Sequence, residues 1–421
     1  MPGAGTRPAI TRSEPPARLL DVTRLASRAG RGLTGVDRVE RAYLQHLLAC
    51  PGPLFGLART VTGFALLDRD GMAALLDRVD GRQDWGAADL VARMARRLTP
   101  MRQRADADLR RLAAARSSRI GLKWLLRRRL PERTAYINVG HSNLTPRVIR
   151  GLRALPGATI AVMIHDTIPL DFPDFQRAGT VERFRALLAL VGRHADLILA
   201  NSQQTERDTR RWLTAMGLKA RYQTALLGVD MPAPDPDALP DGLGIARPYF
   251  VCLGTIEPRK NHALLLDAWE EMARTMPPDA LPLLVVAGSR GWRNEAVFDR
   301  LDRMANDPKS GIREVAGLSD RAVAALLSGA AGLLQPSFAE GYGLPCAEAA
   351  ALQIPVICSD LPVYREMLGD IPVYLSPSDS YSWIKNIKQL TQAHGNTPRG
   401  RSQATDLPTW TSHFKVVLRV T

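Results

Sequence analysis

Residues 336–360 read PSFAEGYGLPCAEAAALQIPVICSD, and this stretch decides the expected fold. The apolar run Gly332–Gln335 comes before it, and a second such run, Val356–Cys358, lies near its end. Between the two, a glycine-rich turn leads into a segment of small residues with a helical pattern. Strand, helix and strand in this order form the repeating unit of a parallel α/β sheet. We therefore expect a strand–turn–helix junction at Glu340–Glu348.

The turn at this junction carries groups that suit a phosphorylated ligand. Pro345 fits the first helical position, where its missing N–H costs nothing. Gly341 and Gly343 let backbone approach a ligand closely, and free N–H groups at a helix start bind phosphate. Glu340 is expected to project into a cleft, and Glu348 falls on the first helical turn. These carboxylates can hold two hydroxyl-bearing rings on either side of a diphosphate. A turn cap and a residue that complements the helix dipole explain the same spacing.

The same alternation of apolar runs and helical segments extends in both directions along the chain. Further helices are expected over Glu182–Val191 and Asn261–Met272. The further strands are expected at Ala135–Val139, Thr159–Ile164, Leu197–Ala200, Tyr249–Leu253 and Leu283–Ala287. Met231–Arg247, rich in Pro, Asp and Gly, interrupts the pattern and contains nothing that forms a packed core. The predicted fold is α/β, with two Rossmann-like doubly wound domains facing a central cleft, where ligands bind beyond the carboxyl ends of strands.

The expected domain boundaries follow from these breaks. Residues 1–18 are predicted to be a disordered lead-in and residues 19–230 an N-terminal, acceptor-side domain. Residues 231–247 form the predicted linker, and 248–379 the domain that binds a nucleotide-linked ligand. Residues 380–421 are predicted to be a helical tail that packs back towards the N-terminal domain, broken near 398–408.

Composition restricts the class of protein. The 421 residues are 45% hydrophobic and 23% charged, as in an ordinary globular enzyme. No uninterrupted run of 18 apolar residues occurs, so no transmembrane helix is expected. The N-terminus lacks the apolar segment of a secretory signal. Four cysteines have no metal-like spacing, which favours free thiols and a cytoplasmic location.

The net charge of +14 is concentrated in one segment. Residues 93–133 hold 14 Lys or Arg and three acidic residues. Such a surplus attracts polyanions. Trp124, Leu125 and Leu126 lie within it, which suits peripheral contact with the inner, anionic face of the cytoplasmic membrane. A solvated helix face explains the segment equally well, and no nucleic-acid-binding signature is present, so no nucleic-acid partner is expected.

Two basic residues follow the strand after the linker. Arg259 and Lys260 stand between Tyr249–Leu253 and the next helix, at a carboxyl end. Cations are unfavourable at the positive end of a helix, so a structural role alone explains the pair poorly. Two fixed cations facing an anionic pocket can instead neutralise a β-phosphate as it leaves.

The N-terminal half contributes two weaker features. The loop that contains Gly35 and Arg38 precedes a helical pattern and can approach a diphosphate, although an ordinary turn fits as well. His165 and Asp166 end the strand Thr159–Ile164. A histidine there can hydrogen-bond a sugar hydroxyl or a forming anion, although a lone histidine is usually structural. Asn201 and Ser202 end the next strand, where a helix cap is the simple explanation.

Residues 336–360 resemble the signature of the retaining glycosyltransferases of family 4, which have the GT-B fold. The resemblance includes both glutamates, the Gly341-Tyr342-Gly343-Leu344-Pro345 turn and the strand after it. It implies that Glu340 holds hydroxyls of the donor sugar and that Glu348 holds the ribose hydroxyls. The family also has an Arg/Lys pair at Arg259-Lys260. Its TGxxR loop and HD motif match the residues around Gly35, Arg38 and His165.

One residue departs from the family pattern. Many members have an arginine directly after the strand glycine, whereas Thr255 follows Gly254 here. Some phosphate contact is therefore lost or is supplied by Arg259. The family also uses turns like those at 285–288 and at Val315–Ser319 to hold the nucleobase with backbone groups, although glycine-ended strands are common in α/β domains.

The resemblance implies a retaining hexosyltransferase, closest to bacterial mannosyltransferases of polysaccharide assembly. GDP-mannose is the first expected donor, UDP- and dTDP-sugars remain open, and the expected acceptor is a saccharide or lipid-linked saccharide. No cofactor or metal is expected, because Arg259 and Lys260 would neutralise the charge that a divalent ion neutralises elsewhere. An epimerase or phosphorylase of similar fold and a non-catalytic basic binding protein are the alternatives.

Overall fold

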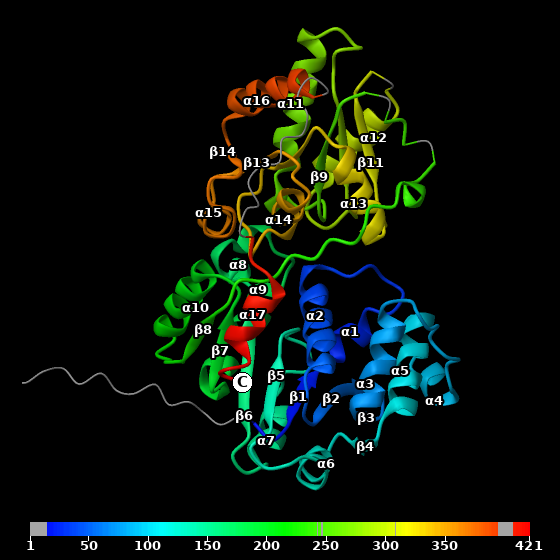
Figure 1. The fold of residues 1–421 in the computed structure, drawn as a ribbon, viewed down its shortest axis with the longest axis vertical. Helices are drawn as coiled ribbons and strands as arrows, with labels where there is room; N and C mark the ends of the chain where they lie inside the picture. Colours follow the sequence, from blue (N-terminus) through cyan, green and yellow to red (C-terminus); the bar gives the residue numbers. More distant parts are fainter. Residues whose placement is uncertain (1–14, 242, 246, 308, 395–406) are drawn as a thin grey trace, which may run out of the picture.

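The computed structural model describes residues 15–241, 243–245, 247–307, 309–394 and 407–421. Residues 1–14 of the expected lead-in, and most of the expected break at 398–408, lie outside these ranges. Two sheets, each with helices on both faces, lie one above the other in Figure 1. The α/β fold class with two Rossmann-like domains is confirmed.

The N-terminal sheet has eight strands in the order β4-β3-β2-β1-β5-β6-β7-β8. All neighbouring strands pair in parallel except β3, which is antiparallel to both β2 and β4. The strands are β1 (Arg18–Asp21), β2 (Leu54–Thr60), β3 (Gly63–Leu67), β4 (Ala115–Ser118), β5 (Ala135–Asn138), β6 (Thr159–Ile164), β7 (Leu197–Ala200) and β8 (Tyr222–Thr224).

Ten α-helices accompany this sheet among the described residues. They are α1 (Thr23–Ser27), α2 (Gly35–Ala49), α3 (Arg69–Val79), α4 (Leu90–Met94), α5 (Pro100–Leu112), α6 (Leu122–Arg129), α7 (Pro146–Arg153), α8 (Ile168–Asp171), α9 (Thr180–His194) and α10 (Gln203–Ala215). A short 3₁₀-helix, η1, spans Pro173–Phe175.

The C-terminal sheet has six parallel strands in the order β11-β10-β9-β12-β13-β14. The strands are β9 (Tyr249–Leu253), β10 (Leu283–Ala287), β11 (Ile312–Val315), β12 (Gly332–Gln335), β13 (Val356–Ser359) and β14 (Val373–Leu375). The helices are η3 (Pro258–Lys260), α11 (His262–Thr275), α12 (Glu295–Ala305), α13 (Asp320–Gly329), α14 (Leu344–Ala351), α15 (Pro362–Leu368), α16 (Ser380–Ala393) and α17 (Trp410–Val417).

Both faces of each sheet are buried. In β6, Ile160, Val162 and Ile164 pack under α6, α7, α9 and α10, while Ala161 and Met163 pack on the opposite side. This two-sided burial explains why the parallel strands read as continuous apolar runs. The core on the Ala161 side continues into the C-terminal domain below α13, α14 and α15, so a single apolar cluster joins both domains.

Two segments cross between the domains. The segment 231–247 was expected to contribute nothing to a core, but it contains the short helix η2 (Pro236–Ala238), and Leu239 and Leu243 pack against the shared apolar cluster. Helix α17 lies against the N-terminal domain (Figure 1). Its His413 bonds the Tyr43 hydroxyl on α2 at 2.8 Å.

The first 118 residues departed most from expectation. The lead-in was predicted to reach residue 18, but Arg18 already begins β1. Strands β1–β4 were not predicted, and the antiparallel β3 departs from the expected parallel sheet. Composition explains part of this: β4, with the sequence ARSS, has no apolar run that would mark a strand, and β1 is only four residues long.

Candidate functional site

The strand order of the C-terminal sheet creates a crevice between β9 and β12. These strands are neighbours, but the chain leaves β9 towards β10 and leaves β12 towards β13, in opposite directions across the sheet. Such a switch point leaves the carboxyl ends of both strands uncovered for a ligand. Arg259 and Lys260 follow β9, and Glu340 follows β12. Topology therefore brings the predicted cations and carboxylate together.

Glu340 is held by three donors. Lys260 Nζ donates to its Oε1 at 2.6 Å, and Arg259 lies 2.9 Å from Oε2. The Ser337 hydroxyl donates to Oε1 at 2.7 Å. The side chain of Glu340 is only 7% exposed, so this ion cluster is buried. The sequence predicted the three charged residues but neither their mutual pairing nor the part played by Ser337.

The pKa of Glu340 reflects this surrounding. Burial alone raises the pKa of the carboxyl, but Lys260 and Arg259 outweigh burial and lower it to about 2. Burial alone lowers the pKa of Arg259. The carboxylates of Glu340 and Glu257 outweigh this effect, so the pKa of Arg259 is raised overall. Glu340 and Arg259 are therefore both charged at neutral pH.

Arg259 is the more constrained of the two cations. Its guanidinium also bonds Glu257 at 2.6 Å and the Ala339 carbonyl at 2.6 Å. The backbone N–H of Phe338 donates to the Arg259 carbonyl at 2.9 Å. Arg259 thus fastens the loop after β9 to the loop after β12.

Backbone conformation explains Gly254. Its φ of +134° is one that side chains rarely adopt, and a Cβ there would meet the Lys260 side chain at 3.4 Å. The neighbouring Thr255 is exposed and is followed by the buried Ile256. Thr255 thus stands exposed at the carboxyl end of β9.

Glu348 was predicted to lie on the first turn of its helix, and this prediction was wrong. Helix α14 begins at Leu344, so Glu348 lies one turn further in, and dipole complementation does not explain it. Its side chain is 4% exposed and pairs with Arg38 from the N-terminal domain. Arg38 also approaches Asp320 at 3.4 Å. Burial raises the pKa of Glu348, and Arg38 only partly offsets this.

The helix start at Gly343 has the geometry of an anion site. Gly343 has φ +94°, and a Cβ would overlap the Tyr364 ring, so only glycine fits. The N–H groups of Gly343 and Leu344 make no hydrogen bond within the part of the chain that the structure describes. Free N–H groups at a helix start attract anions. Leu344 itself faces α2, since a Cβ on Gly35 would lie 3.5 Å from its side chain.

His165 faces the same crevice from the N-terminal domain. Its Nε2 donates to the Val139 carbonyl at 2.6 Å, since a carbonyl can only accept. Burial, assisted by the nearby His141, lowers its pKa to about 3. The imidazole is therefore neutral, with only Nδ1 left for a ligand. A neutral imidazole can accept from a sugar hydroxyl through Nδ1, whereas hydrogen-bonding a forming anion would require a proton on Nδ1 as well.

The loop after β12 touches the N-terminal domain directly. Asn201 Nδ2 donates to the His165 carbonyl at 2.9 Å and to the Gly341 carbonyl at 3.3 Å. A Cβ on Gly341 would meet Asp166 Oδ2 at 2.8 Å, so glycine permits this approach. Asn201 therefore links the domains in addition to standing at the start of a helix.

Three further residues were predicted to contact the ligand: Tyr342, Gly35 and Val315. The Tyr342 hydroxyl donates to the Leu227 carbonyl at 2.7 Å, so its side chain points into the domain junction rather than the crevice. Gly35 is the first residue of α2 and Val315 the last of β11. Val315 is buried, and the exposed residues Ala316 and Gly317 follow it, so backbone there remains accessible.

Other contacts across the domain junction had no sequence signal. Glu366 accepts hydrogen bonds from the backbone N–H groups of Gln203 and Gln204 at the start of α10, at 2.6 Å and 3.2 Å. Trp292 Nε1 donates to the Phe175 carbonyl at 2.8 Å. Each pair is more than 100 residues apart in sequence. These contacts join the two domains.

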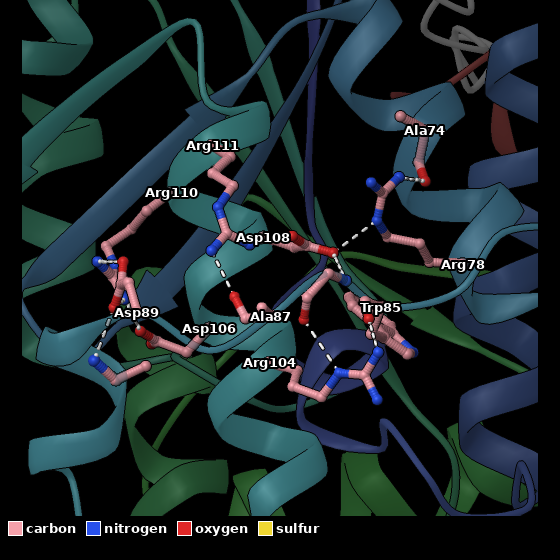
Figure 2. A network of polar contacts seen from close by, with 12 residues as sticks. Ala74, Arg78, Trp85, Ala87, Asp89, Arg104, Asp106, Asp108, Arg110 and Arg111 are labelled. Carbon is pink, nitrogen blue, oxygen red and sulfur yellow. Dashed lines mark hydrogen bonds and ion pairs between the residues drawn. The ribbon is translucent and has the colours of Figure 1, made fainter.

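The basic segment 93–133 divides into paired and unpaired cations. Figure 2 shows Arg110 beside Asp89 and Asp106, and Arg111 beside Asp108. Arg104 donates to the Trp85 carbonyl. These arginines fasten the loop before α4 to α5. They are structural residues and form no free basic face.

The apolar part of the predicted membrane contact is also partly wrong. Leu125 and Leu126 are buried in the core, because α6 packs on α7. Trp124 remains 75% exposed and Ile120 89% exposed. None of the described helices is both long enough and apolar enough to cross a bilayer. Among these residues no group of three His, Cys, Asp or Glu side chains could hold a metal ion.

Comparison with known proteins finds a matching family model and several relatives. Residues 241–396 match the family model of glycosyl transferases group 1. The chain is 27% identical over 293 residues to the serotype-specific mannosyltransferase WbdA of Escherichia coli, covering 66% of this chain and 36% of that protein. It is 34% identical over 149 residues to the O-antigen chain mannosyltransferase RfbU of Salmonella typhimurium, covering 34% of this chain and 40% of that protein.

The whole fold also has relatives of known structure. The crystal structure of Anabaena Alr3699/HepE in complex with UDP-glucose matches with a TM-score of 0.58 and 13% identity, over 96% of this chain and 94% of that chain. The chain therefore has the GT-B fold. It spans little more than a third of the length of the WbdA relative that it matches.

Proposed function

We propose that this protein is a glycosyltransferase that moves a hexose from a nucleotide sugar onto a saccharide or lipid-linked saccharide in polysaccharide or glycolipid assembly. The observation that carries the proposal is the buried cluster of Glu340, Lys260 and Arg259 at the switch point of a glycosyl transferases group 1 domain. The mannosyltransferase relatives support a mannose donor in particular.

The contacts suggest different tasks for the two cations. An ammonium group has three donors, and Lys260 uses one of them on Glu340 within the described residues. Arg259 spends its guanidinium on Glu257, Ala339 and Glu340. Lys260 is therefore the better ligand for the β-phosphate of the donor, and Arg259 positions Glu340. Together they supply positive charge where the leaving diphosphate gains negative charge.

The proposed reaction retains configuration at the anomeric carbon and uses no metal or other cofactor. The bond between the anomeric carbon and the β-phosphate oxygen breaks, and a bond from the acceptor oxygen forms on the same face. The acceptor proton passes to the leaving phosphate oxygen, so no separate protein base is required. Glu340 holds hydroxyls of the transferred sugar, and His165 Nδ1 accepts from another hydroxyl.

The proposed donor is GDP-mannose. Glu348 would hold the ribose, the N–H groups of Gly343 and Leu344 a phosphate, and backbone after Val315 the base. Arg38 contacts one oxygen of Glu348 and also approaches Asp320, so ribose hydroxyls can bind the carboxylate beside Arg38 or in its place. In either case the Arg38 guanidinium would lie close to the diphosphate.

A thermal-shift screen tests the donor. A ligand at 100 times its Kd stabilises the native state by about 2.7 kcal/mol, which raises Tm measurably. We expect GDP-mannose to raise Tm more than UDP- or dTDP-sugars. A larger shift with UDP-glucose would reject the mannose assignment.

Transfer from a labelled donor tests the reaction itself. Lys260→Ala should abolish product formation while circular dichroism stays unchanged, and the exposed Lys123→Ala should have no effect. An altered free nucleotide sugar without glycoside would identify an epimerase and refute the proposal.

Contact with an anionic membrane surface is the remaining part of the proposal. Trp124 lies in α6, and Ile120 lies just before the helix; both side chains are exposed. Lys123 and Arg127 of the same helix are also exposed. An aromatic ring among cations suits the interface of a bilayer. Cosedimentation with vesicles of anionic lipid should fall for Trp124→Ala, and unchanged binding would remove this surface from consideration.

A further inference from the structure

A large cavity lies in the N-terminal domain, outside the donor crevice. Its volume is about 810 Å³, within the range of small-molecule sites. Thr23 lines it after β1, Thr60 at the end of β2, and Asn143 after β5. These three strands are parallel neighbours. A second cavity of about 290 Å³ shares Asn143 with it, so the two cavities are adjacent.

Arginines dominate the lining of both cavities. Five line the larger cavity, and two more line the smaller one. The set is Arg59, Arg96, Arg97, Arg102, Arg119, Arg147 and Arg150, with Arg59 and Arg119 shared by both cavities. None of the seven forms an ion pair with an acidic side chain in the described residues, in contrast to Arg110 and Arg111 nearby. We call these seven residues and the space they surround the arginine pocket.

The acidic residue in the lining cannot neutralise them. Asp106 is buried, and its carboxylate accepts from the Val61 N–H at 2.8 Å and from Arg110 at 3.1 Å. Neutral donors complete the wall, among them Thr23, Ser142 and Asn143. Six of the seven arginines are exposed and Arg102 is half-buried, so water and salt screen part of their mutual repulsion, and an anion bound among them would lower it further. Guanidinium forks match phosphate oxygens in pairs, which favours a phosphate group over an isolated carboxylate.

The residues that line the larger cavity do not favour a nucleic-acid strand as its ligand. Aromatic side chains stack on bases in proteins that bind single strands. No aromatic residue is among the described residues that line the larger cavity. Met94, Leu98 and Leu109 instead form an apolar portion of the wall. A ligand with a phosphorylated group and an adjoining apolar or sugar portion fits this wall.

The arginine pocket adjoins the donor crevice along the edge of the sheet. The pocket lies at the carboxyl ends of β2, β1 and β5. The next strand in the sheet is β6, and His165 directly follows it. Neighbouring strands lie about 4.8 Å apart. Ser142 lines the pocket, and the preceding His141 has its ring centroid 5.3 Å from that of His165. The pocket and the sugar-facing histidine are therefore close neighbours.

We propose that the arginine pocket binds a phosphate or diphosphate on the acceptor, at the end remote from the hydroxyl that receives the sugar. The inference rests on the proposed function, because the ligand is the acceptor of that reaction. It makes the enzyme selective for phosphorylated acceptors, whether lipid-linked or free, over neutral saccharides of the same length.

The first test measures binding without catalysis. Inorganic pyrophosphate is titrated calorimetrically into the wild type, into Arg59→Ala/Arg119→Ala, and into the matched control Arg193→Ala/Arg207→Ala. The control removes two exposed cations of the same domain outside both cavities. We expect about a 10- to 100-fold weaker Kd for the pocket variant alone, since charge-assisted hydrogen bonds are lost. Binding at the donor crevice would be the same in all three proteins.

The second test measures transfer to three acceptors: a mannosyl alkyl diphosphate, the alkyl mannoside with the same tail, and mannose 1-phosphate. The pocket variant should show a raised KM for phosphorylated acceptors and an unchanged KM for the neutral acceptor and the donor. A preference for the alkyl diphosphate over mannose 1-phosphate assigns the lipid-linked form, and the reverse assigns the free form. Both support the pocket.

Other outcomes overturn the inference. Equal use of neutral and phosphorylated acceptors by the wild type would do so, as would pyrophosphate binding that is the same in all three proteins. If the pocket variant loses only binding to anionic vesicles, the pocket is a membrane contact and not an acceptor site. If the wild type transfers from no nucleotide sugar, the proposed function fails, while the pyrophosphate titration still decides whether the pocket binds diphosphate.

Discussion

Replacing each of the two buried site glutamates by glutamine should change stability unequally. Glutamine has nearly the shape of a protonated glutamate, so each substitution mimics neutralisation. Glu340 has its pKa lowered from 4.5 to about 2, whereas that of Glu348 is raised. Glu340→Gln should therefore destabilise the protein at pH 7, and Glu348→Gln should cost little or stabilise it.

The magnitude for Glu340 follows from its pKa. A depression from 4.5 to about 2, converted at 1.36 kcal/mol for each pKa unit, corresponds to roughly 3 kcal/mol at pH 7. Because the pKa is lower in the folded than in the unfolded state, this stability is present above about pH 4.5. It is lost as the pH falls from there to about 2. At pH 3 the difference between wild type and Glu340→Gln should be about 1.4 kcal/mol.

Urea titration followed by circular dichroism measures both variants at pH 7 and at pH 3. Glu271→Gln serves as an exposed control, since this carboxylate pairs only with Arg274 at the surface. Equal stability of wild type and Glu340→Gln at pH 7 would refute the geometry of the cluster. A loss for Glu348→Gln as large as that for Glu340→Gln would show that Arg38 outweighs burial, contrary to our reasoning.

Three further changes have definite expected results. His262→Leu should raise Tm, more at pH 5 than at pH 7. Both ring nitrogens of His262 are buried without a partner among the described residues, and burial followed by Lys260 lowers its pKa to about 3, so the unfolded state takes up a proton as the pH falls below 6.5. An unchanged Tm would mean that water or another partner satisfies the ring. Gly341→Ala should reduce transfer at least tenfold with unchanged circular dichroism, since its Cβ would lie 2.8 Å from Asp166 Oδ2; full turnover would show that the domains are not held at this distance during catalysis. Thr255→Arg should lower the KM for the donor because the position is exposed at the crevice, and a raised KM would show that the side chain obstructs the site.

The sequence predicted those parts of the site that depend on topology. Gly254, Arg259 and Glu340 each follow an apolar run, and the carboxyl ends of parallel strands meet at one edge. Their proximity therefore followed from order along the chain. What sequence could not predict was pairing between side chains distant in the chain. Arg38 and Glu348 are 310 residues apart, and either alone is consistent with several partners.

The misjudged elements have a common physical cause. Leu125 and Leu126 were predicted to face a membrane because the local sequence does not indicate that α7 covers α6. Whether a helical residue is buried depends on the element that packs against it. The arginines of 93–133 resembled one basic surface for a similar reason. Few of these arginines pair with a carboxylate such as that of Asp89 or Asp106. Only the three-dimensional structure distinguishes the paired arginines from those that line a cavity.

The ligand-free arrangement of charge links the donor site to domain closure. Each of the two site carboxylates already has a cation: Glu340 has Lys260 and Arg259 from its own domain, and Glu348 has Arg38 from the other domain. The first cluster can admit a diphosphate without separating, because Lys260 has donors to spare. At the second, Arg38 contacts Oε1 of Glu348, and a carboxylate has a second oxygen that can accept further hydrogen bonds. In the proposed donor site, ribose hydroxyls at Glu348 would therefore bind beside a contact between the domains, whereas Glu340 pairs with cations of its own domain. We accordingly expect the ribose end of the donor, more than its sugar, to affect the domain junction.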